Sequence, residues 1–209
     1  MTSSATQPRG RRTQQQRSDA TTHELLAAAR TLFARDGYAA TSLEAICAEA
    51  HSTKGALYHH FRGKESLFRA VYEREQQRLS ANIAETYARY DDPWEGLYQG
   101  LKAFLTGSME PGVQRITLID APGAIGWTAM REMRADCRRN LVYGLRRALG
   151  PDARCEIESL ASILYGALCE SAVALAHCAE PAALLDATLA QLRILFDGFA
   201  PPPHSVLRP

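Results

Sequence analysis

Apolar residues recur at helical spacing along most of this chain, and short polar or helix-breaking segments separate the repeats. The first repeat predicts a helix over residues 21–36, capped by Thr21 or Thr22 and ended by Gly37. Its apolar face consists of Leu25, Leu26, Ala29, Leu32 and Phe33. Residues 1–20, by contrast, are polar and rich in Arg, Gln and Ser, so we expect a disordered basic arm there.

Two shorter helical patterns follow within residues 41–67, separated by a break at His51-Ser52. The first begins at Thr41, which we expect to form a capping box with Glu44. The second is capped by Ser52 or Thr53. Its inward face is predicted to contain Ala56, Leu57, His60 and Phe61, and its outer face Thr53, Lys54, Gly55, Tyr58 and His59.

The remaining two thirds of the chain also repeat with helical period. A long helix is predicted from about Lys64 to Tyr87, and the Asp91-Asp92-Pro93 break precedes another amphipathic helix. Further helices are expected over residues 128–149, 155–178 and from Pro181 to Phe196. The last two are apolar nearly all round, which suggests a subunit interface. No strand-like alternation occurs, so the predicted fold is all-α.

The second short helix has the properties of a DNA-reading element. A helix this short is unstable alone, so it must be clamped by the helices before and after it. Lys, Thr and Tyr side chains suit phosphate oxygens, and small or hydrogen-bonding groups suit base edges. A short clamped helix with a polar outer face is what a helix-turn-helix places in the major groove. An ordinary solvated helix is the alternative on spacing alone.

The motif residues together resemble the DNA-binding motif of the tetracycline-repressor (TetR) family. They are Thr41, Ile46, Ala50, Lys54, Gly55, Leu57, Tyr58, His60, Phe61, Lys64 and Leu67. The chain departs from the family at the turn, where His51-Ser52-Thr53 replaces the usual Gly-Val-Ser. Histidine tolerates a left-handed backbone less well than glycine, so the turn is expected to be less stable. The run from Leu118 to Trp127 resembles a segment found in one large branch of these regulators.

The resemblance implies an architecture. An N-terminal three-helix helix-turn-helix DNA-binding domain (residues 21–80, with the motif at about 42–61) would be joined by a long helix to a C-terminal helical ligand-binding and dimerisation domain (81–209). It also implies a homodimeric transcriptional repressor, released from a palindromic double-stranded DNA operator by a small, largely apolar effector of unknown identity. Implied DNA-binding residues are Thr41, Thr53, Lys54, Gly55, Tyr58, His59, His60 and Lys64.

An effector would bind within the C-terminal domain, between the connecting helix and those after it. Candidate ligand-binding residues are Trp94, Tyr98, Phe104, Met109, Trp127, Met130, Tyr165, Cys169 and His177. Aromatic stripes at helical spacing are also typical of an ordinary core, so both interpretations stay open for each residue.

Charge distribution is consistent with DNA binding at one end of the chain. The net charge is +1, but residues 1–80 carry 12 Lys and Arg against 8 Asp and Glu, and residues 81–209 carry 12 against 15. The arm arginines, Arg9, Arg11, Arg12 and Arg17, either contact DNA or are solvated. The sequence shows neither a secretory signal nor an apolar run of about 18 residues, so we expect a cytoplasmic protein that does not enter a membrane.

Catalytic motifs are missing from the sequence. It has no glycine-rich phosphate loop, G-x-S-x-G or H-E-x-x-H, so we expect no enzyme, cofactor or metal site. His177, Cys169 and Cys178 match no standard metal spacing, and a buried histidine with a backbone partner is the better interpretation of His177. The five cysteines are expected to be reduced thiols, a redox-sensing pair being the alternative. Two alternative functions remain: an enzyme with an appended DNA-binding head, and a protein-interaction module.

Overall fold

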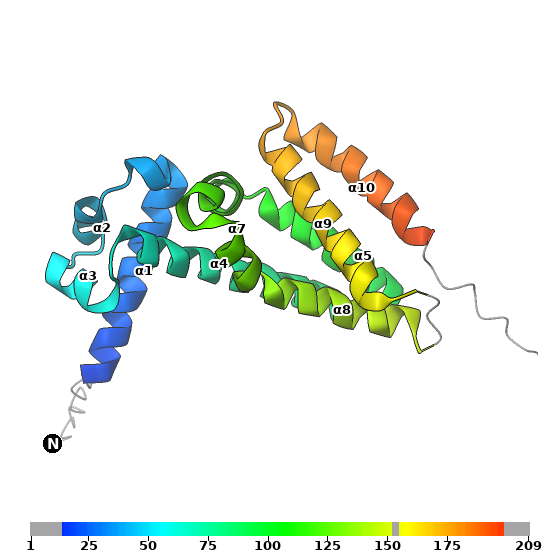
Figure 1. The fold of residues 1–209 in the computed structure, drawn as a ribbon, viewed down its shortest axis with the longest axis horizontal. Coiled ribbons are helices and arrows are strands. Elements are labelled where there is room, and N and C mark those ends of the chain that lie inside the picture. The colour runs from blue at the N-terminus through cyan, green and yellow to red at the C-terminus, as the bar shows by residue number, and fades with distance from the viewer. Residues whose placement is uncertain (1–13, 152–154, 199–209) are drawn as a thin grey trace, which may run out of the picture.

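The chain folds into helices only, over the residues that the structure describes. The computed structural model describes residues 14–151 and 155–198, and no strand occurs among them. The elements in order are α1 (Gln14–Ala40), α2 (Leu43–Glu49), α3 (Lys54–His60), α4 (Lys64–Tyr87), α5 (Pro93–Ser108), α6 (Pro111–Gln114), the π-helical turn η1 (Arg115–Asp120), α7 (Ala121–Met133), α8 (Ala135–Leu149), α9 (Ile157–Ala176) and α10 (Pro181–Asp197). Figure 1 shows α1 to α3 gathered at one end and α5 and α8 to α10 at the other, with α4 running between them.

The head consists of α1, α2, α3 and the start of α4, packed around one apolar cluster. Leu25, Phe33, Ile46, Leu57 and Phe68 are all fully buried in it. These side chains come from four separate helices, so the short α3 is clamped by its neighbours, as its length requires. The helix expected over residues 21–36 is longer than predicted and spans Gln14–Ala40.

Part of the expected disordered arm is therefore helical. Residues 14–20 belong to α1, whereas Arg9, Arg11 and Arg12 lie outside the described residues. Thr22 does not cap the helix but sits inside it, where its hydroxyl donates to the carbonyl of Ser18 at 3.0 Å. Gly37 does interrupt the helix, because its φ of 83° lies in the left-handed region, and one further turn continues to Ala40.

The capping box predicted for Thr41 and Glu44 is wrong. Ser42 is the N-cap of α2, and its side chain accepts the amide of Ala45. Thr41 is only 3% exposed, and its hydroxyl donates to the carbonyl of Gly37 at 2.8 Å. Thr41 and Ser42 both carry a hydroxyl, so the sequence does not show which of them caps α2. Ser42 is the cap because Thr41 is buried against the kink of α1.

In the body, α5 and α8 pack against α4, α9 packs against α5 and α8, and α10 packs against α5 and α9. The core of the body is mainly leucine, including Leu101, Leu141, Leu164 and Leu192. The single helix predicted over residues 128–149 is instead two helices. The chain bends at Gly126, where φ is 75°, and α7 ends before Arg134, where the backbone leaves helical geometry. Arg134 lies at this break because its guanidinium donates to the hydroxyl of Tyr72 at 2.6 Å and to the carbonyl of Thr117 at 3.3 Å.

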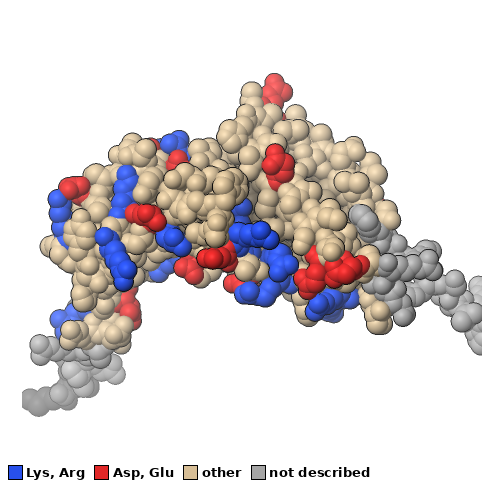
Figure 2. Space-filling model, viewed as in Figure 1, with Lys and Arg blue, Asp and Glu red and all other residues tan. Residues whose placement is uncertain are grey.

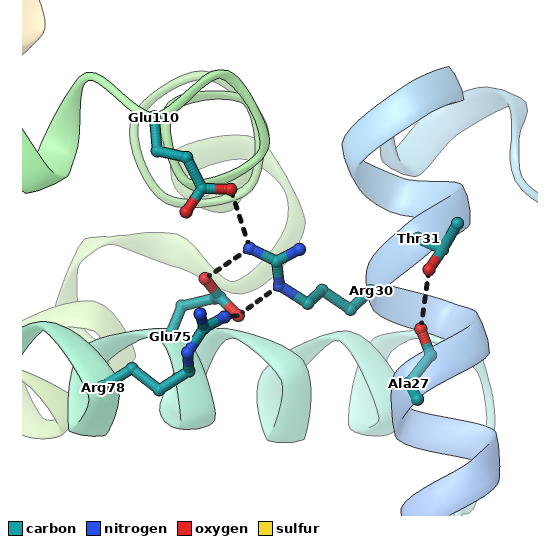
Figure 3. Close-up of polar contacts among 6 residues, drawn as sticks. All are labelled: Ala27, Arg30, Thr31, Glu75, Arg78 and Glu110. Atoms are coloured by element: carbon teal, nitrogen blue, oxygen red, sulfur yellow. Dashed lines mark hydrogen bonds and ion pairs between the residues drawn. The ribbon is translucent and has the colours of Figure 1, made fainter.

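Head and body meet through buried polar contacts beside α1. The carboxylate of Asp120, at the end of η1, accepts the backbone amide of Tyr38 at 2.8 Å and the Arg115 guanidinium at 3.2 Å. A Cβ at Gly37 would collide with that guanidinium. In Figure 3, Arg30 of α1 reaches Glu75 of α4 and Glu110, which immediately precedes α6. The head is thus fixed to the body at two separate points.

The helix α9 is the most apolar of the long helices. Among the described residues it is the one helix with the length and hydropathy that could cross a membrane, although the sequence led us to expect none. Its buried side, including Leu160, Leu164 and Leu168, packs into the body core. Its other side is not covered in the single chain, where Ile163 is 69% exposed. It is therefore a core helix of the body with one apolar face left open.

Candidate functional site

The helix α3 presents two different faces, as the sequence pattern predicted. Thr53, Lys54, Gly55, Tyr58 and His59 are all exposed, and the Tyr58 side chain reaches 57% exposure. Leu57 and Phe61 are buried in the head core. The outer face therefore gathers a hydroxyl, a cation, a bare backbone position, a phenol and an imidazole on one accessible surface.

The turn before α3 is a Schellman motif with histidine in the place that usually holds glycine. The amide of His51 donates to Ala48 and that of Ser52 to Cys47, at 3.2 and 2.9 Å. His51 has a φ of 48°, and it is the one residue other than glycine with positive φ in the described chain. Thr53 then caps α3 by accepting the amide of Ala56 at 3.1 Å. The predicted strain at His51 is thus real, and its backbone hydrogen bonds hold the turn nonetheless.

An ion pair joins α2 to α3 next to the turn. The ammonium of Lys54 lies 2.5 Å from Oε1 of Glu44, with both side chains largely exposed. This hydrogen bond raises the pKa of Lys54 and lowers that of Glu44, so both stay charged near neutral pH. Surface pairs of this kind contribute little to stability. The pair instead orients the Lys54 ammonium at the edge of the outer face.

Lys64 stands at the start of α4, on the side where α1 ends. Its ammonium donates to the carbonyl of Ala39 at 3.1 Å and lies 4.5 Å from the centre of the Tyr38 ring. These contacts use only part of its donor capacity, because an ammonium has three N–H groups. A cation held at a helix N-terminus is a suitable place for a phosphate oxygen.

Gly55 has no packing role inside the head. A Cβ there would meet only the Thr53 hydroxyl, at 3.8 Å, and the residue is exposed. Glycine in a helix costs about 0.5–1 kcal/mol relative to alanine. Since nothing within the described chain requires it, close approach of an outside partner to the backbone is a physical reason for glycine at this position.

Two of the implied DNA-binding residues point away from the outer face. Thr41 is buried, as described above, and the structure removes it from the accessible set. His60 turns towards α1, where its Nδ1 lies 3.2 Å from the Thr22 hydroxyl, and its role is to brace α3. His59 stays outside and lines a shallow hollow together with Arg17 of α1. Arg17 is thereby brought beside α3.

Surface charge differs between the two ends of the molecule. Figure 2 shows Lys and Arg side chains over the head and along the lower edge of the body. Over α9 and α10 the surface in this view is mainly uncharged. Ile194 and Leu195 of α10, like Ile163, are more than half exposed there. The molecule thus has a polar head and an apolar outer body face.

A cavity of about 560 Å³ lies within the body between α4, α5, α8 and α9. Of the ligand-binding residues predicted from the sequence, Phe104 and Tyr165 line it. Trp127, Met130 and Cys169 instead line a separate cavity of about 100 Å³ beside Arg134. The structure therefore divides these five predicted residues between two places.

The other predicted ligand residues have partners of their own. Trp94 stacks on Phe196 at 3.9 Å between ring centres, and the Tyr98 hydroxyl donates to the Leu189 carbonyl at 3.4 Å. Met109 packs against the body core at the end of α5. His177 has the backbone partner that we expected, since its Nδ1 lies 2.8 Å from the Val173 carbonyl, but the predicted burial is wrong, because the residue is exposed at the end of α9. None of these four lines the larger cavity.

Sequence reasoning missed two polar residues of this larger cavity, Tyr87 and Arg147, although it did predict Tyr165. Tyr87 and Tyr165 line it and have buried hydroxyls without a hydrogen-bond partner among the described residues. Arg147 lies at the same cavity, with its guanidinium 5.9 Å from the Tyr87 ring centre. The only signal in the sequence was the arginine-rich side of α8, which does not show which arginine faces a cavity.

Two of the five thiols, Cys137 and Cys169, are held in their protonated form. Burial raises the pKa values of Cys137 and Cys169, so both remain protonated at neutral pH. Burial also raises the pKa of Tyr72, beside Arg134, to about 12. Across residues 14–151 and 155–198, no three His, Cys, Asp or Glu side chains come together as metal ligands would.

Two family models match adjacent parts of the chain. Residues 25–71 match "Bacterial regulatory proteins, tetR family", and residues 94–199 match "Tetracyclin repressor-like, C-terminal domain". The first covers the helix-turn-helix and the second covers α5 to α10.

Known proteins give the same assignment. The TetC protein of transposon Tn10 from Escherichia coli is 30% identical over 120 residues, which are 57% of this chain and 60% of TetC. The transcriptional regulator UidR of E. coli K12 is 36% identical over 35% of this chain and 34% of its own length. The chain thus matches less than two thirds of either curated relative.

Solved structures match over more of the chain. A TetR-family transcriptional regulator from Pectobacterium atrosepticum has a TM-score of 0.77 and 33% identity, over 92% of this chain and all of that one. The regulator FadR from Bacillus subtilis, solved in complex with stearoyl-CoA, is 14% identical with a TM-score of 0.68, over 84% of this chain and 98% of its own, and so shows only a shared fold.

Proposed function

The chain belongs to the TetR family of bacterial regulatory proteins, and on this premise we propose that it is a dimeric repressor of transcription controlled by a small molecule. The observation that carries the proposal is the outer face of α3, where Thr53, Lys54, Gly55, Tyr58 and His59 are exposed together. On this proposal α3 enters the major groove. Lys64 and Tyr58 bind phosphates on either side of it.

Dimerisation through α9 and α10 is supported by their uncovered apolar surface. Ile163, Ile194 and Leu195 are 60–69% exposed in the single chain. The neighbouring exposed positions are mostly small, such as Gly166, Ala167 and Ala187, which lets helices approach closely. Two-fold pairing of these helices would place the two α3 helices on one side of a dimer. The operator would then be a near-palindrome with half-sites about one DNA turn apart.

Effector control is supported by the position of the large cavity. Ile83, Ala84 and Tyr87 of α4 line it, and the same helix begins in the head with Lys64. A volume of about 560 Å³ falls within the usual range for small-molecule sites. A ligand that fits only one orientation of α4 would change the populations of DNA-binding and non-binding dimers by its differential affinity.

An enzymatic role has less support. The family and the structural relatives are transcriptional regulators, and no observation here favours catalysis. The DNA titration described below also distinguishes a repressor from a protein-interaction module. A module that bound only protein would not use the outer face of α3 to bind DNA.

The decisive experiment titrates the purified protein against the DNA immediately upstream of its own coding region, at two salt concentrations. We expect tight, salt-dependent binding of a dimer centred on a near-palindrome. Ile163→Arg should yield a monomer with much weaker operator binding, whereas Lys102→Glu, an exposed site on α5, should keep the dimer. Weak binding without sequence preference by a folded dimer would contradict autoregulation at this site. If no DNA from the same genome were selected either, the repressor proposal would fail.

A further inference from the structure

The large cavity of the body has hydrogen-bonding groups in its wall as well as apolar ones. Leucine and phenylalanine side chains, such as Leu97, Leu101 and Phe104, form much of its lining. The hydroxyls of Tyr87 and Tyr165 are buried and lack a hydrogen-bond partner among the described residues. The Cys169 thiol is near Tyr165, but a thiol is a weak partner. Both hydroxyl oxygens are enclosed by protein, so a ligand in the cavity meets the apolar side chains and the charged residues of its lining.

Arg147 is the basic residue in the lining of the cavity. Its guanidinium lies over two tyrosine rings, 5.9 Å from the centre of Tyr87 and 6.0 Å from that of Tyr143. Both rings also line the cavity. Arg147 is exposed at the cavity, and among the described residues no hydrogen bond or ion pair occupies its N–H groups, so they are free for an acceptor.

Arg147 differs from the other arginines of α8 in its lack of an acidic partner. Arg138 and Arg146 both pair with Glu158, and Arg139 pairs with Asp136. Arg147 has no carboxylate within ion-pair distance in the part of the chain that the structure describes. An arginine that is aligned at a cavity and unpaired is suited to a ligand carboxylate, which accepts two parallel hydrogen bonds from a guanidinium.

Asp91 also lines the cavity, and it raises the opposite possibility of a cationic ligand. A cation would need the faces of the tyrosine rings, as in aromatic cages. Arg147 already lies over Tyr87 and Tyr143, so an incoming cation would have to displace it against charge repulsion. The arrangement thus favours a negatively charged group at this end of the cavity.

We propose that the effector is an amphipathic organic anion, with its carboxylate or similar acidic group on Arg147 and its apolar body among Leu97, Leu101 and Phe104. This inference rests on the proposed function, because it specifies the ligand of the regulatory cavity, and it explains why α8 leaves one arginine unpaired.

Two fluorescent probes with nearly the same aromatic frame test the charge requirement. 8-Anilinonaphthalene-1-sulfonate carries an anionic group, and N-phenyl-1-naphthylamine lacks it. We expect the wild-type protein to bind the sulfonate more tightly. Arg147→Gln should weaken sulfonate binding about tenfold and change binding of the neutral probe by less than twofold. Arg146→Gln, next to it but paired with Glu158 outside the cavity, should change neither.

A blocking variant shows whether the probes occupy this cavity. Ala84 is exposed and lines it, so Ala84→Trp should prevent binding of both probes without unfolding the protein. If Ala84→Trp abolishes binding but wild type and Arg147→Gln bind the sulfonate equally, the anion inference is overturned and the regulatory cavity stands. If wild type binds neither probe, or Ala84→Trp has no effect, the cavity is not the effector site, and that part of the proposed function fails as well.

Discussion

Arg30 of α1 holds the carboxylate of Glu75 of α4 at two points: Nε lies 2.7 Å from Oε1, and Nη2 lies 3.3 Å from Oε2 (Figure 3). The Glu75 side chain is only 2% exposed, so this pair is shielded from solvent on the carboxylate side. Arg78 reaches the same carboxylate at 3.3 Å, and Nη2 of Arg30 also donates to Glu110 at 3.0 Å. The pair thus ties the head to its connecting helix.

Breaking the buried Arg30–Glu75 pair should lower the free energy of unfolding more than breaking the exposed Arg30–Glu110 pair does. Arg30→Ala leaves a buried carboxylate with only the exposed Arg78, so we expect the free energy of unfolding to fall by about 2–4 kcal/mol. Glu110→Gln, whose side chain is 48% exposed, should lower it by less than about 1 kcal/mol. Urea unfolding followed by circular dichroism measures both. Equal effects of the two variants would contradict a buried anchoring role for Glu75.

The turn residue His51 offers a stabilising substitution. Its φ of 48° is strained for a side chain with Cβ, and glycine removes that strain. We expect His51→Gly to raise the free energy of unfolding by about 0.5–1 kcal/mol and to leave operator affinity unchanged or higher. Ser52→Gly is the control, because Ser52 is outside the left-handed region and glycine there only adds freedom to the unfolded chain. Thermal unfolding curves that rank Ser52→Gly above His51→Gly would refute this account.

Replacing Gly55 by alanine should raise the stability of α3 and lower its affinity for DNA. Gly55→Ala is expected to stabilise α3 by about 0.5–1 kcal/mol, because its Cβ has open space. The same methyl would hinder close approach of the helix to DNA, so operator affinity should fall at least fivefold. Gly123→Ala in α7 also has open space but lies outside the head, and it should leave DNA binding unchanged. Unchanged DNA affinity in Gly55→Ala would remove Gly55 from the interface.

Lys64 should contribute to DNA binding through phosphate rather than base contact. Lys64→Ala is expected to weaken binding to all sequences alike and to reduce the slope of log affinity against log salt by about 1. Tyr58→Phe should likewise weaken binding to all sequences. Lys102→Ala on α5 is the matched lysine control. The prediction is refuted if operator and random DNA respond differently to Lys64→Ala, or if the salt slope is unaltered.

Alkaline pH should weaken the body and its junction with the head. Cys137, Cys169 and Tyr72 have pKa values raised by burial, so the folded state holds their protons more tightly than the unfolded state does. Stability is then fully present below the unfolded thiol pKa of about 8.5 and is lost as pH rises through the folded values. Urea midpoints should fall between pH 8 and pH 10. Cys137→Ala should reduce the size of that fall, and Cys155→Ala, at an exposed thiol, should not.

Local signals in the sequence were sufficient for the elements that have clear boundaries. Gly63 and Lys64 mark the start of α4, and Asp92-Pro93 caps α5 where predicted. The split of α3 into two faces also followed from spacing alone. By contrast, the break between α7 and α8 has no glycine or proline at Arg134. It depends on the contacts of that arginine with Tyr72 and Thr117, which lie far away in sequence.

The candidate site was predictable to different degrees for similar reasons. The outer face of α3 is a property of one short helix, so the sequence contained it. The resemblance implied DNA contact for Thr41 and His60, but both side chains bond to α1, at Gly37 and Thr22. Helical spacing had already placed His60 on the inward face of α3. The cavity is formed by four helices, and its polar residues, Tyr87 and Arg147, are separated by 60 positions, so helical spacing alone could not bring them together.

The length of α4 determines how far a small rotation of this helix displaces the DNA-binding head. Its 24 residues make a rod about 36 Å long, so a rotation of only about 5° at the cavity end displaces Lys64 by about 3 Å. Adjacent base pairs are about 3.4 Å apart along the duplex. An angular change too small to disturb the packing around Leu101 would therefore move the DNA-binding head by nearly one base-pair step. That step is the distance between one register along the major groove and the next.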